Sequence, residues 1–300
     1  MYALEVKNLI KTFNGLTAVN DVSFTISENS IFGLIGRNGA GKTTTIRMMM
    51  NIYLPDSGEV ILRGTRIGQD FRNKVGYLPE ERGLYKQMKV LDTLLFFAEV
   101  KGKIGKKVLK KADEYLERFG LLDRKNSKVE DLSKGNQQKL QFITTILHDP
   151  DFLILDEPFS GLDPVNINII KEIILDLKRS GKVIIFSTHL MDFAEKLCDE
   201  IAMIDHGKII LSGSLPEIKN RFAEDNITLS FNGDISFLRE SRLVESIEDF
   251  GNTTGIKVKK EAGTQALLKL LVENNINISS FDANQISLHD IFIKLAGKEE

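Results

Sequence analysis

A glycine-rich loop near the N-terminus restricts the possible folds more than any other feature of this sequence. It lies between an apolar run, Ile31–Ile35, and a segment of helical character, Lys42–Ile52. It reads Gly36-Arg37-Asn38-Gly39-Ala40-Gly41-Lys42-Thr43. This is the pattern G-x-x-x-x-G-K-[ST], and its place between a buried strand and a helix is typical of a phosphate-binding loop. The loop therefore predicts an α/β fold of the P-loop type.

Each part of this loop suits a phosphate. Glycines let successive backbone N–H groups turn inward, and the helix that follows adds the positive end of its dipole. Lys42 supplies a mobile positive charge for the β- and γ-phosphates of a nucleotide, and the Thr43 hydroxyl can ligate Mg²⁺. By itself, the motif predicts a nucleoside triphosphatase.

A strand–helix–strand unit further along the chain strengthens the prediction of a parallel sheet. Phe152–Leu155 and Lys182–Ser187 are short apolar runs. The segment between them is amphipathic, with apolar residues at Val165, Ile169, Ile173 and Leu177. Two strands joined by a crossover helix pair in parallel. Residues 84–147 also have helical periodicity, so we expect a helical subdomain over about residues 84–150, inserted into the α/β core.

Candidate catalytic side chains follow both strands of this unit. Asp156 and Glu157 end the first strand, and His189 ends the second. The carboxyl ends of parallel strands form the edge of a sheet at which ligands bind. Asp156 can bind Mg²⁺ there through water, while Glu157, on the other side of the pleat, can orient the attacking water or accept its proton. The other three histidines are expected to be structural or solvated.

Composition excludes several classes of function. The chain has 300 residues, 42% of them hydrophobic, and a formal charge of −2, so it has enough apolar residues for two domains and no basic excess for general nucleic-acid binding. The N-terminus lacks the basic start and apolar run of a signal peptide, and no stretch approaches the roughly 18 apolar residues of a membrane span. The single cysteine, Cys198, cannot form an internal disulfide. We expect a cytosolic protein without a nucleic-acid partner.

The chain is expected to divide near Leu215–Asp225, into residues 1–215 and an accessory domain of residues 216–300. The second part contains a βαβ-like stretch over roughly 227–296, with a helix at Thr264–Glu273, a strand at Ile276–Phe281 and a helix after Ser287. It has no second phosphate loop, metal-ligand cluster or basic stripe. We therefore expect a small α+β domain without chemistry of its own.

A segment shortly before the acidic strand relates the chain to a known family. It opens a helix and reads Leu132-Ser133-Lys134-Gly135-Asn136-Gln137-Gln138. It resembles the LSGGQ signature of ABC ATPases, with lysine for the first glycine and asparagine for the glutamine. The order of phosphate loop, signature, Asp156-Glu157, Ser160-Gly161-Leu162-Asp163 and His189 is similar to that of an ABC nucleotide-binding domain over residues 2–215. The resemblance implies ATP and Mg²⁺ as cofactors and an ATPase activity coupled to transport.

The resemblance also implies roles for individual residues. ATP contacts are expected from Phe13, as the aromatic that stacks on adenine, and from Gly36, Arg37, Asn38, Gly39, Ala40, Gly41, Lys42, Thr43 and Thr44. Catalytic roles are expected for Lys42, Glu157 and His189, the last as the switch histidine. Ser133, Gly135 and Asn136 would contact the γ-phosphate held by the other subunit, and Asp163 would lie in the D-loop at the dimer interface. One phosphate loop and one signature make two half-sites, so the chain needs a second copy or a close relative.

One departure from the family concerns the stretch Val75–Gly83, which resembles the Q-loop. Glu80 stands where most relatives have glutamine. A carboxylate can still approach Mg²⁺ and the attacking water, so Glu80 joins Thr43 and Asp156 as an expected metal ligand. The Q-loop stretch, the signature and the segment Ser287–Phe292 together resemble the sodium-efflux-type branch of ABC-2 exporter ATPases.

This resemblance implies a pair of ATPase subunits that closes on ATP and drives a separate integral membrane permease, in the direction of export, from the cytoplasmic face of the membrane. Permease docking is expected in the cleft near Glu80–Met88. Two other functions stay open. One is a non-transport ABC ATPase that acts on ribosomes or DNA, although that branch usually has two ATPase cassettes in one chain. The other is a regulatory module that holds ATP without turnover, against which the presence of Lys42, Glu157 and His189 argues.

Overall fold

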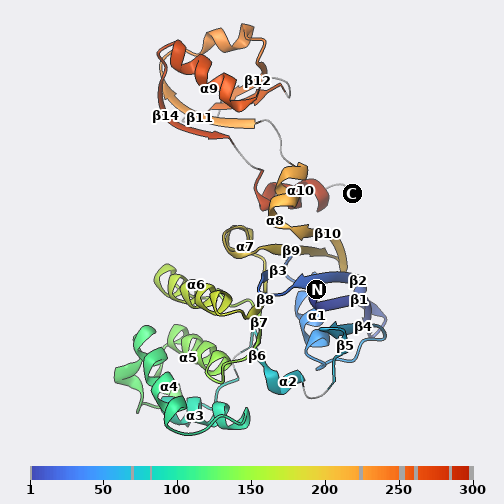
Figure 1. Cartoon of the computed structure of the whole chain (residues 1–300), viewed down its shortest axis with the longest axis vertical. Helices are drawn as coiled ribbons and strands as arrows, with labels where there is room; N and C mark the ends of the chain where they lie inside the picture. The colour runs from blue at the N-terminus through green and yellow to red at the C-terminus, as the bar shows by residue number, and fades with distance from the viewer. Residues whose placement is uncertain are drawn as a thin grey trace. The chain divides into compact units, whose positions relative to one another are not determined.

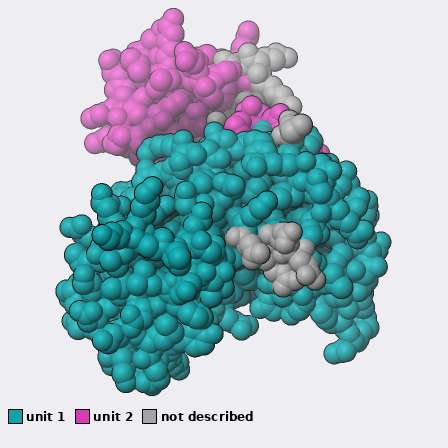
Figure 2. All heavy atoms as spheres, turned by 60° about the horizontal axis from the view of Figure 1, so that its bottom comes forward, with its two compact units in different colours: residues 1–215 teal, residues 216–300 magenta. Residues whose placement is uncertain are grey.

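The structure is a computed structural model that describes residues 2–68, 71–81, 83–222, 226–249, 254–259, 263–283 and 286–296. The chain forms two compact units, residues 1–215 and residues 216–300 (Figure 2). The first is an α/β unit and the second is built on a small antiparallel sheet, which confirms the predicted fold class. Within the described ranges, no helix has the length and apolarity that crossing a bilayer requires.

A six-stranded sheet forms the centre of the first unit (Figure 1). Its strands, in spatial order, are β10 (Lys208–Ser214), β9 (Glu200–Asp205), β3 (Ile31–Ile35), β8 (Val183–Thr188), β7 (Phe152–Asp156) and β6 (Val75–Leu78). All neighbours pair in parallel except the edge strand β10. β3, β7 and β8 are buried along their whole length, as is typical of parallel strands covered on both faces.

A second, antiparallel sheet packs against the first through a shared core. Its strands are β2 (Leu16–Ser27), β1 (Tyr2–Phe13), β4 (Ser57–Leu62) and β5 (Thr65–Arg66). β1 is long because irregularities in its pairing, one of them between Val6 and Leu9, interrupt the alternation of its side chains without ending the strand. Helix α1 (Lys42–Met49) lies between the two sheets, and its buried side chains join their core (Figure 1).

The other large helices of this unit lie on the opposite side of the central sheet (Figure 1). They are α3 (Val90–Val100), α4 (Lys106–Arg118), α5 (Lys134–Ile146) and α6 (Pro164–Arg179). α3, α4 and α5 pack on one another and form the expected helical subdomain, in which the rings of Phe119 and Phe142 meet edge to face. Shorter elements complete the unit: α2 (Phe71–Lys74), α7 (Met191–Leu197) and two 3₁₀ turns at Leu122–Arg124 and Val129–Asp131.

The buried face of α6 differs from the predicted one. Val165 was expected on that face but is 70% exposed, and the buried residues are Ile170, Ile173, Ile174 and Leu177. The reason is geometric. Positions four apart rotate about 40° relative to one another on a helix of 3.6 residues per turn, so a series of such steps drifts off the buried stripe.

The second unit has its own sheet and core. Its strands, in spatial order, are β12 (Val244–Asp249), β13 (Thr254–Val258), β11 (Asn226–Asn232) and β14 (Asn277–Ala283). Its helices are α8 (Leu215–Phe222), α9 (Thr264–Glu273) and α10 (Leu288–Ala296), with a 3₁₀ turn at Ser236–Glu240. The predicted βαβ-like stretch was wrong about pairing. α9 connects β13 to β14, but β11 lies between these two strands, and every pair in the sheet is antiparallel.

Candidate active site

The phosphate loop leaves β3 and enters α1 through a turn that requires glycine at several positions. Gly39 and Gly41 have φ angles of 82° and 106°, in the left-handed region. A Cβ atom on Gly41 would lie 2.6 Å from the Ala18 carbonyl oxygen, and one on Gly36 would lie 2.2 Å from the Ile204 carbonyl oxygen. The loop is therefore clamped between neighbouring backbone segments, which fixes the start of α1.

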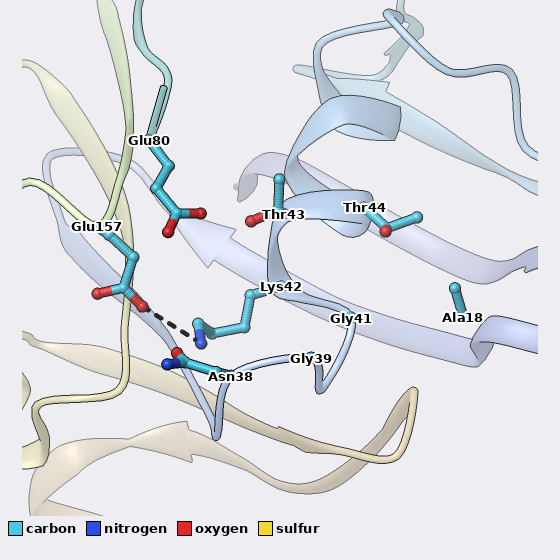
Figure 3. A pocket seen from close by; sticks show the side chains of 9 residues that line it. All are labelled: Ala18, Asn38, Gly39, Gly41, Lys42, Thr43, Thr44, Glu80 and Glu157. Carbon is cyan, nitrogen blue, oxygen red and sulfur yellow. Dashed lines mark ion pairs between the residues drawn. The ribbon is translucent and has the colours of Figure 1, made fainter. Parts of the chain in front are cut away.

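Lys42, the first residue of α1, turns its side chain back over the loop. Its ammonium group donates to the carbonyl oxygens of Gly36 at 2.8 Å and Arg37 at 3.1 Å. Nζ also lies 3.3 Å from Oε1 of Glu157, and both side chains are buried (Figure 3). A positive charge is thus held at the centre of the loop, where phosphate oxygens would bind.

A cavity of about 330 Å³ opens over this loop. Its lining residues are Ala18, Asn38, Gly39, Gly41, Lys42, Thr43, Thr44, Glu80 and Glu157. Figure 3 shows the two carboxylates, Glu80 and Glu157, on one side, facing Thr43 and Lys42 on the other. The cavity thus combines a phosphate loop, a cation, a hydroxyl group and two carboxylates, and its volume is within the range of small-ligand sites.

Glu157 is held in an unusual backbone conformation directly after β7. Its φ angle is 49°, which costs a non-glycine residue on the order of 1–3 kcal/mol. Its N–H donates to Oγ of Ser187 at 3.0 Å, and Oε2 lies 3.0 Å from Nδ1 of His189. Oε1 lies at ion-pair distance from Lys42 but has no hydrogen bond within the described residues. One oxygen of the carboxylate is therefore oriented by His189, and the other can accept a proton or a water.

Asp156, the last residue of β7, presents a carboxylate that suits a divalent cation. Ser187 on the neighbouring strand donates to Oδ1 at 2.5 Å, whereas the buried Oδ2 has no partner within the described residues. Burial raises the pKa of Asp156, and the hydroxyls of Ser187 and Thr43 act in the opposite direction. A buried, unpaired carboxylate oxygen near a threonine hydroxyl is a donor set that fits Mg²⁺, which would also favour the ionised form.

A smaller cavity of about 120 Å³ adjoins these carboxylates. Its lining residues are Leu78, Pro79, Glu80, Gln138, Gln141, Asp156, Glu157, Ser160 and Gly161. Glu80 and Glu157 line both cavities, so the segment after β6 and the segment after β7 meet at this point. The carboxylates were predicted from the sequence, whereas Ser187 and Gln141 were not predicted as their neighbours. Ser187 ends the second apolar run much as Asp156 follows the first, and the two residues pair in the adjacent strands β8 and β7.

Some expected residues lie outside the lining of both cavities. Ser133 caps α5 by accepting a hydrogen bond from the Asn136 N–H at 3.2 Å, and Asp163 caps α6 in the same way through the Asn166 N–H at 3.0 Å. Phe13 ends β1, is 38% exposed and packs edge to face against Tyr53. The remaining expected residues outside both linings are Gly36, Arg37, Ala40, Gly135, Asn136 and His189. A single chain therefore does not bring the signature segment to its own phosphate loop.

A third cavity, of about 410 Å³, lies at the junction of the helical subdomain with the central sheet. Its lining residues are Met50, Ile52, Tyr77, Pro79, Gly83, Leu84, Phe97, Val100, Lys101, Gln141, Thr144, Thr145 and His148. Most of this surface is apolar, and we refer to the cavity as the apolar cleft. It includes part of the segment near Glu80–Met88 in which docking was expected, although Arg82 lies outside the described residues.

Comparison with known proteins agrees with this geometry. The model of the ABC transporter family matches residues 19–160, and that of the DrrA1-3-like ATP-binding protein C-terminal domain matches residues 213–296. The ABC transporter ATP-binding protein YhaQ of Bacillus subtilis (strain 168) is 42% identical over 98% of both chains.

A second relative is the Nod factor export ATP-binding protein I of Ralstonia nicotianae (strain ATCC BAA-1114 / GMI1000). It is 32% identical over 99% of this chain and 94% of its own. A solved ATP-binding subunit of an ABC transporter is 32% identical, with a TM-score of 0.69 over 73% of this chain and 93% of its own. This chain therefore belongs to the family of ABC transporter ATP-binding proteins and is an ABC-type ATPase.

Proposed function

We propose that this chain hydrolyses Mg²⁺–ATP as one half of a dimer and so drives a separate membrane permease in the direction of export. One observation carries the catalytic part of the proposal. The Glu157 carboxylate lies between Lys42 and His189, at 3.3 Å and 3.0 Å, in the wall of the cavity over the phosphate loop. The candidate base Glu157 thus contacts both the cation Lys42, which faces the phosphates, and the polar side chain of His189.

Each of these residues has a distinct role in the proposed reaction. The loop N–H groups and Lys42 bind the β- and γ-phosphates, which replace Glu157 as the partner of Lys42. Oε1 of Glu157 then accepts a hydrogen bond, and finally a proton, from the attacking water. His189 holds the other carboxylate oxygen and so fixes the direction in which Oε1 points.

Three side chains are proposed to hold Mg²⁺. The Thr43 hydroxyl and the unpaired Oδ2 of Asp156 are the main candidates, and Glu80 faces Thr43 across the cavity (Figure 3). Mg²⁺ is usually bound by one or two carboxylates together with phosphate oxygens and water, so two or three such groups suffice. The bound ion would neutralise negative charge that develops on the γ-phosphate.

The dimer is proposed because the site of one chain is incomplete. Ser133, Gly135 and Asn136 lie outside the lining of the cavity over the phosphate loop. Ser133 caps the N-terminus of α5, however, where helix N–H groups favour an anion. In a two-fold dimer each signature segment would face the phosphate loop of the other chain, with Asp163 between the two subunits. Closing would then bury two ATP molecules and change the shape that the pair presents to the membrane component.

The apolar cleft is the proposed docking site for the permease. The aromatic rings of Tyr85, Phe96 and Phe97 pack together beside it, and Tyr85 remains 55% exposed. A cleft of this composition suits the apolar face of a short helix from a partner. Export is proposed from the resemblance to exporter ATPases and from the relative whose name includes Nod factor export.

The proposal is tested by identifying a multi-span membrane protein that co-purifies with the chain and measuring ATP turnover and transport of the pair in vesicles. We expect Lys42→Ala to abolish both, because it removes the charge that faces the phosphates. Lys7→Ala is the matched control, because Lys7 pairs with Glu5 at the surface of β1 and does not line the cavity over the phosphate loop. This variant should behave like the parent chain. Equal turnover and ATP affinity in Lys42→Ala and the parent chain would contradict the proposed site.

A further inference from the structure

Gln141 lies between the apolar cleft and the active-site carboxylates. It belongs to α5, is 6% exposed, and lines both the apolar cleft and the smaller cavity beside Asp156 and Glu157. Its side-chain amide donates to the carbonyl oxygen of Glu81 at 3.1 Å. A buried amide that bonds to the backbone of another segment fixes that segment's position, because loss of the bond leaves polar groups unsatisfied.

The segment that Gln141 holds also carries the Glu80 side chain. Glu80 precedes Glu81 directly and lines both the cavity over the phosphate loop and the smaller cavity. Pro79, one residue earlier, lines the apolar cleft as well as the smaller cavity. A displacement of this short stretch therefore moves the Glu80 carboxylate relative to Thr43. Gln141, on α5, bonds to the stretch through the Glu81 carbonyl oxygen.

We propose that Gln141 is a positioning residue, which holds the Glu80–Glu81 backbone and links the state of the apolar cleft to the placement of Glu80 at the nucleotide. The inference rests on the proposed function, since it requires Glu80 to act on bound Mg²⁺–ATP. The link runs through α5, and the first turn of this helix belongs to the signature segment. Movement of α5 during dimer closure thus reaches Glu80 through one hydrogen bond.

Steady-state ATPase kinetics of the full chain test the link to Glu80. Gln141→Met keeps the side-chain length and removes the amide, and we expect kcat to fall about tenfold, the effect of about 1.4 kcal/mol of lost positioning, with KM for ATP little changed. Thr93→Val is the matched control, because the buried Thr93 hydroxyl also bonds to a backbone carbonyl, that of Lys89, and Thr93 lines none of the three cavities. The control should keep the parent kcat.

A double-mutant cycle distinguishes positioning from a general loss of structure. If Gln141 acts through Glu80, Gln141→Met should have little further effect on kcat in a Glu80→Ala background. Independent, additive losses in the two variants would overturn the proposal, as would an unchanged kcat in Gln141→Met. Should Gln141→Met not fold, Gln141→Asn, whose amide is too short to reach Glu81, takes its place in the same cycle.

A fluorescent reporter in the cleft tests the other end of the link. Val100 lines the cleft and is 62% exposed, whereas Cys198 is buried and its burial raises the thiol pKa, so a dye reacts selectively with Val100→Cys. We expect Mg²⁺–ATP to change the emission of the dye in the parent background and with Thr93→Val, but not with Gln141→Met. An equal response in all three, or none in the parent, would overturn the link while leaving ATP turnover, and hence the proposed function, intact.

Discussion

At the scale of single residues, the proposed mechanism makes Glu157 and ATP competitors for the Lys42 ammonium. The Lys42 ammonium is buried against two carbonyl oxygens and the Glu157 carboxylate. Phosphate oxygens can bind Lys42 fully only when Glu157 gives it up. The carboxylate that we propose to assist hydrolysis should therefore also weaken ATP binding. The two effects should separate in a variant that keeps the shape of Glu157 and removes its charge.

Glu157→Gln is expected to lower turnover by roughly 10²–10⁴-fold, the usual contribution of a general base, while ATP binds as tightly as in the parent chain or more tightly. Phosphate release and the affinity for a fluorescent ATP analogue measure the two effects. Glu172→Gln, on the exposed side of α6, is the control. Turnover at the parent rate would remove Glu157 from the catalytic role. Weakened ATP binding would contradict the competition for Lys42.

Glu80 allows a second prediction at this scale. If it acts where most relatives have glutamine, Glu80→Gln should retain much of the ATPase activity, because an amide oxygen can still accept from a water or approach Mg²⁺. Glu80→Ala should lose more activity, and coupling to the permease above all. Comparing ATPase rates with and without the permease checks both expectations. Parent-like behaviour of both variants would show Glu80 to be a solvated carboxylate.

At the scale of elements, α5 connects the signature segment at its start with a buried histidine just beyond its end. His148 is 4% exposed, and neither ring nitrogen has a hydrogen-bond partner within the described residues. Burial, together with the positive charge of Lys101, lowers the pKa of His148 from 6.5 to about 4. Lys103 acts in the same direction, while Asp149 and the nearby Val75 backbone oppose the shift. The imidazole is therefore neutral at physiological pH.

This shift predicts that the folded chain loses stability in mild acid. The unfolded chain protonates His148 below pH 6.5 and the folded chain only below about 4, so unfolding takes up a proton between these values. The neutral histidine contributes at most about 3 kcal/mol to the free energy of unfolding. This contribution is fully present above pH 6.5 and is lost as the pH falls to 4. Denaturant unfolding at several pH values should show a weaker pH dependence in His148→Leu. His206→Gln, with an 85% exposed side chain, should match the parent chain.

Which elements the sequence could predict depends on how local their signals are. The phosphate loop, β7, β8 and the bounds of α9 follow from motifs and periodicities within a few residues. β12 and β13 were missed. Four of the six residues of β12 are exposed, so Val244–Asp249 has the character of a polar loop until β13 pairs with it. The same limit applies to the site: the bond from Ser187 to Asp156 and that from Gln141 to Glu81 depend on long-range packing, for which one sequence gives little direct signal.

At the scale of the whole molecule, the two units have separate cores. Among the described residues, a core cluster of the second unit consists of Ile227, Leu229, Leu238, Val244, Ile256, Val258, Leu267 and Leu271. The cavities over the phosphate loop and beside the carboxylates are lined entirely by residues of the first unit. A domain that buries its own apolar side chains and adds none to the site can be removed without opening the core that holds the nucleotide.

Truncation after Phe222 is therefore expected to leave a folded chain that binds ATP nearly as tightly as the full chain. We propose that the second unit acts on the dimer instead, because a pair of subunits that opens and closes gains control from a domain that touches its partner. The truncated chain should form the ATP-dependent dimer of the Glu157→Gln variant less readily, or hydrolyse ATP at an altered rate. Size-exclusion chromatography with ATP and phosphate release measure these two effects.

Failure of the truncated chain to fold would show that the second unit stabilises the first. Unchanged dimer formation and turnover would instead assign the second unit to contacts with the membrane component.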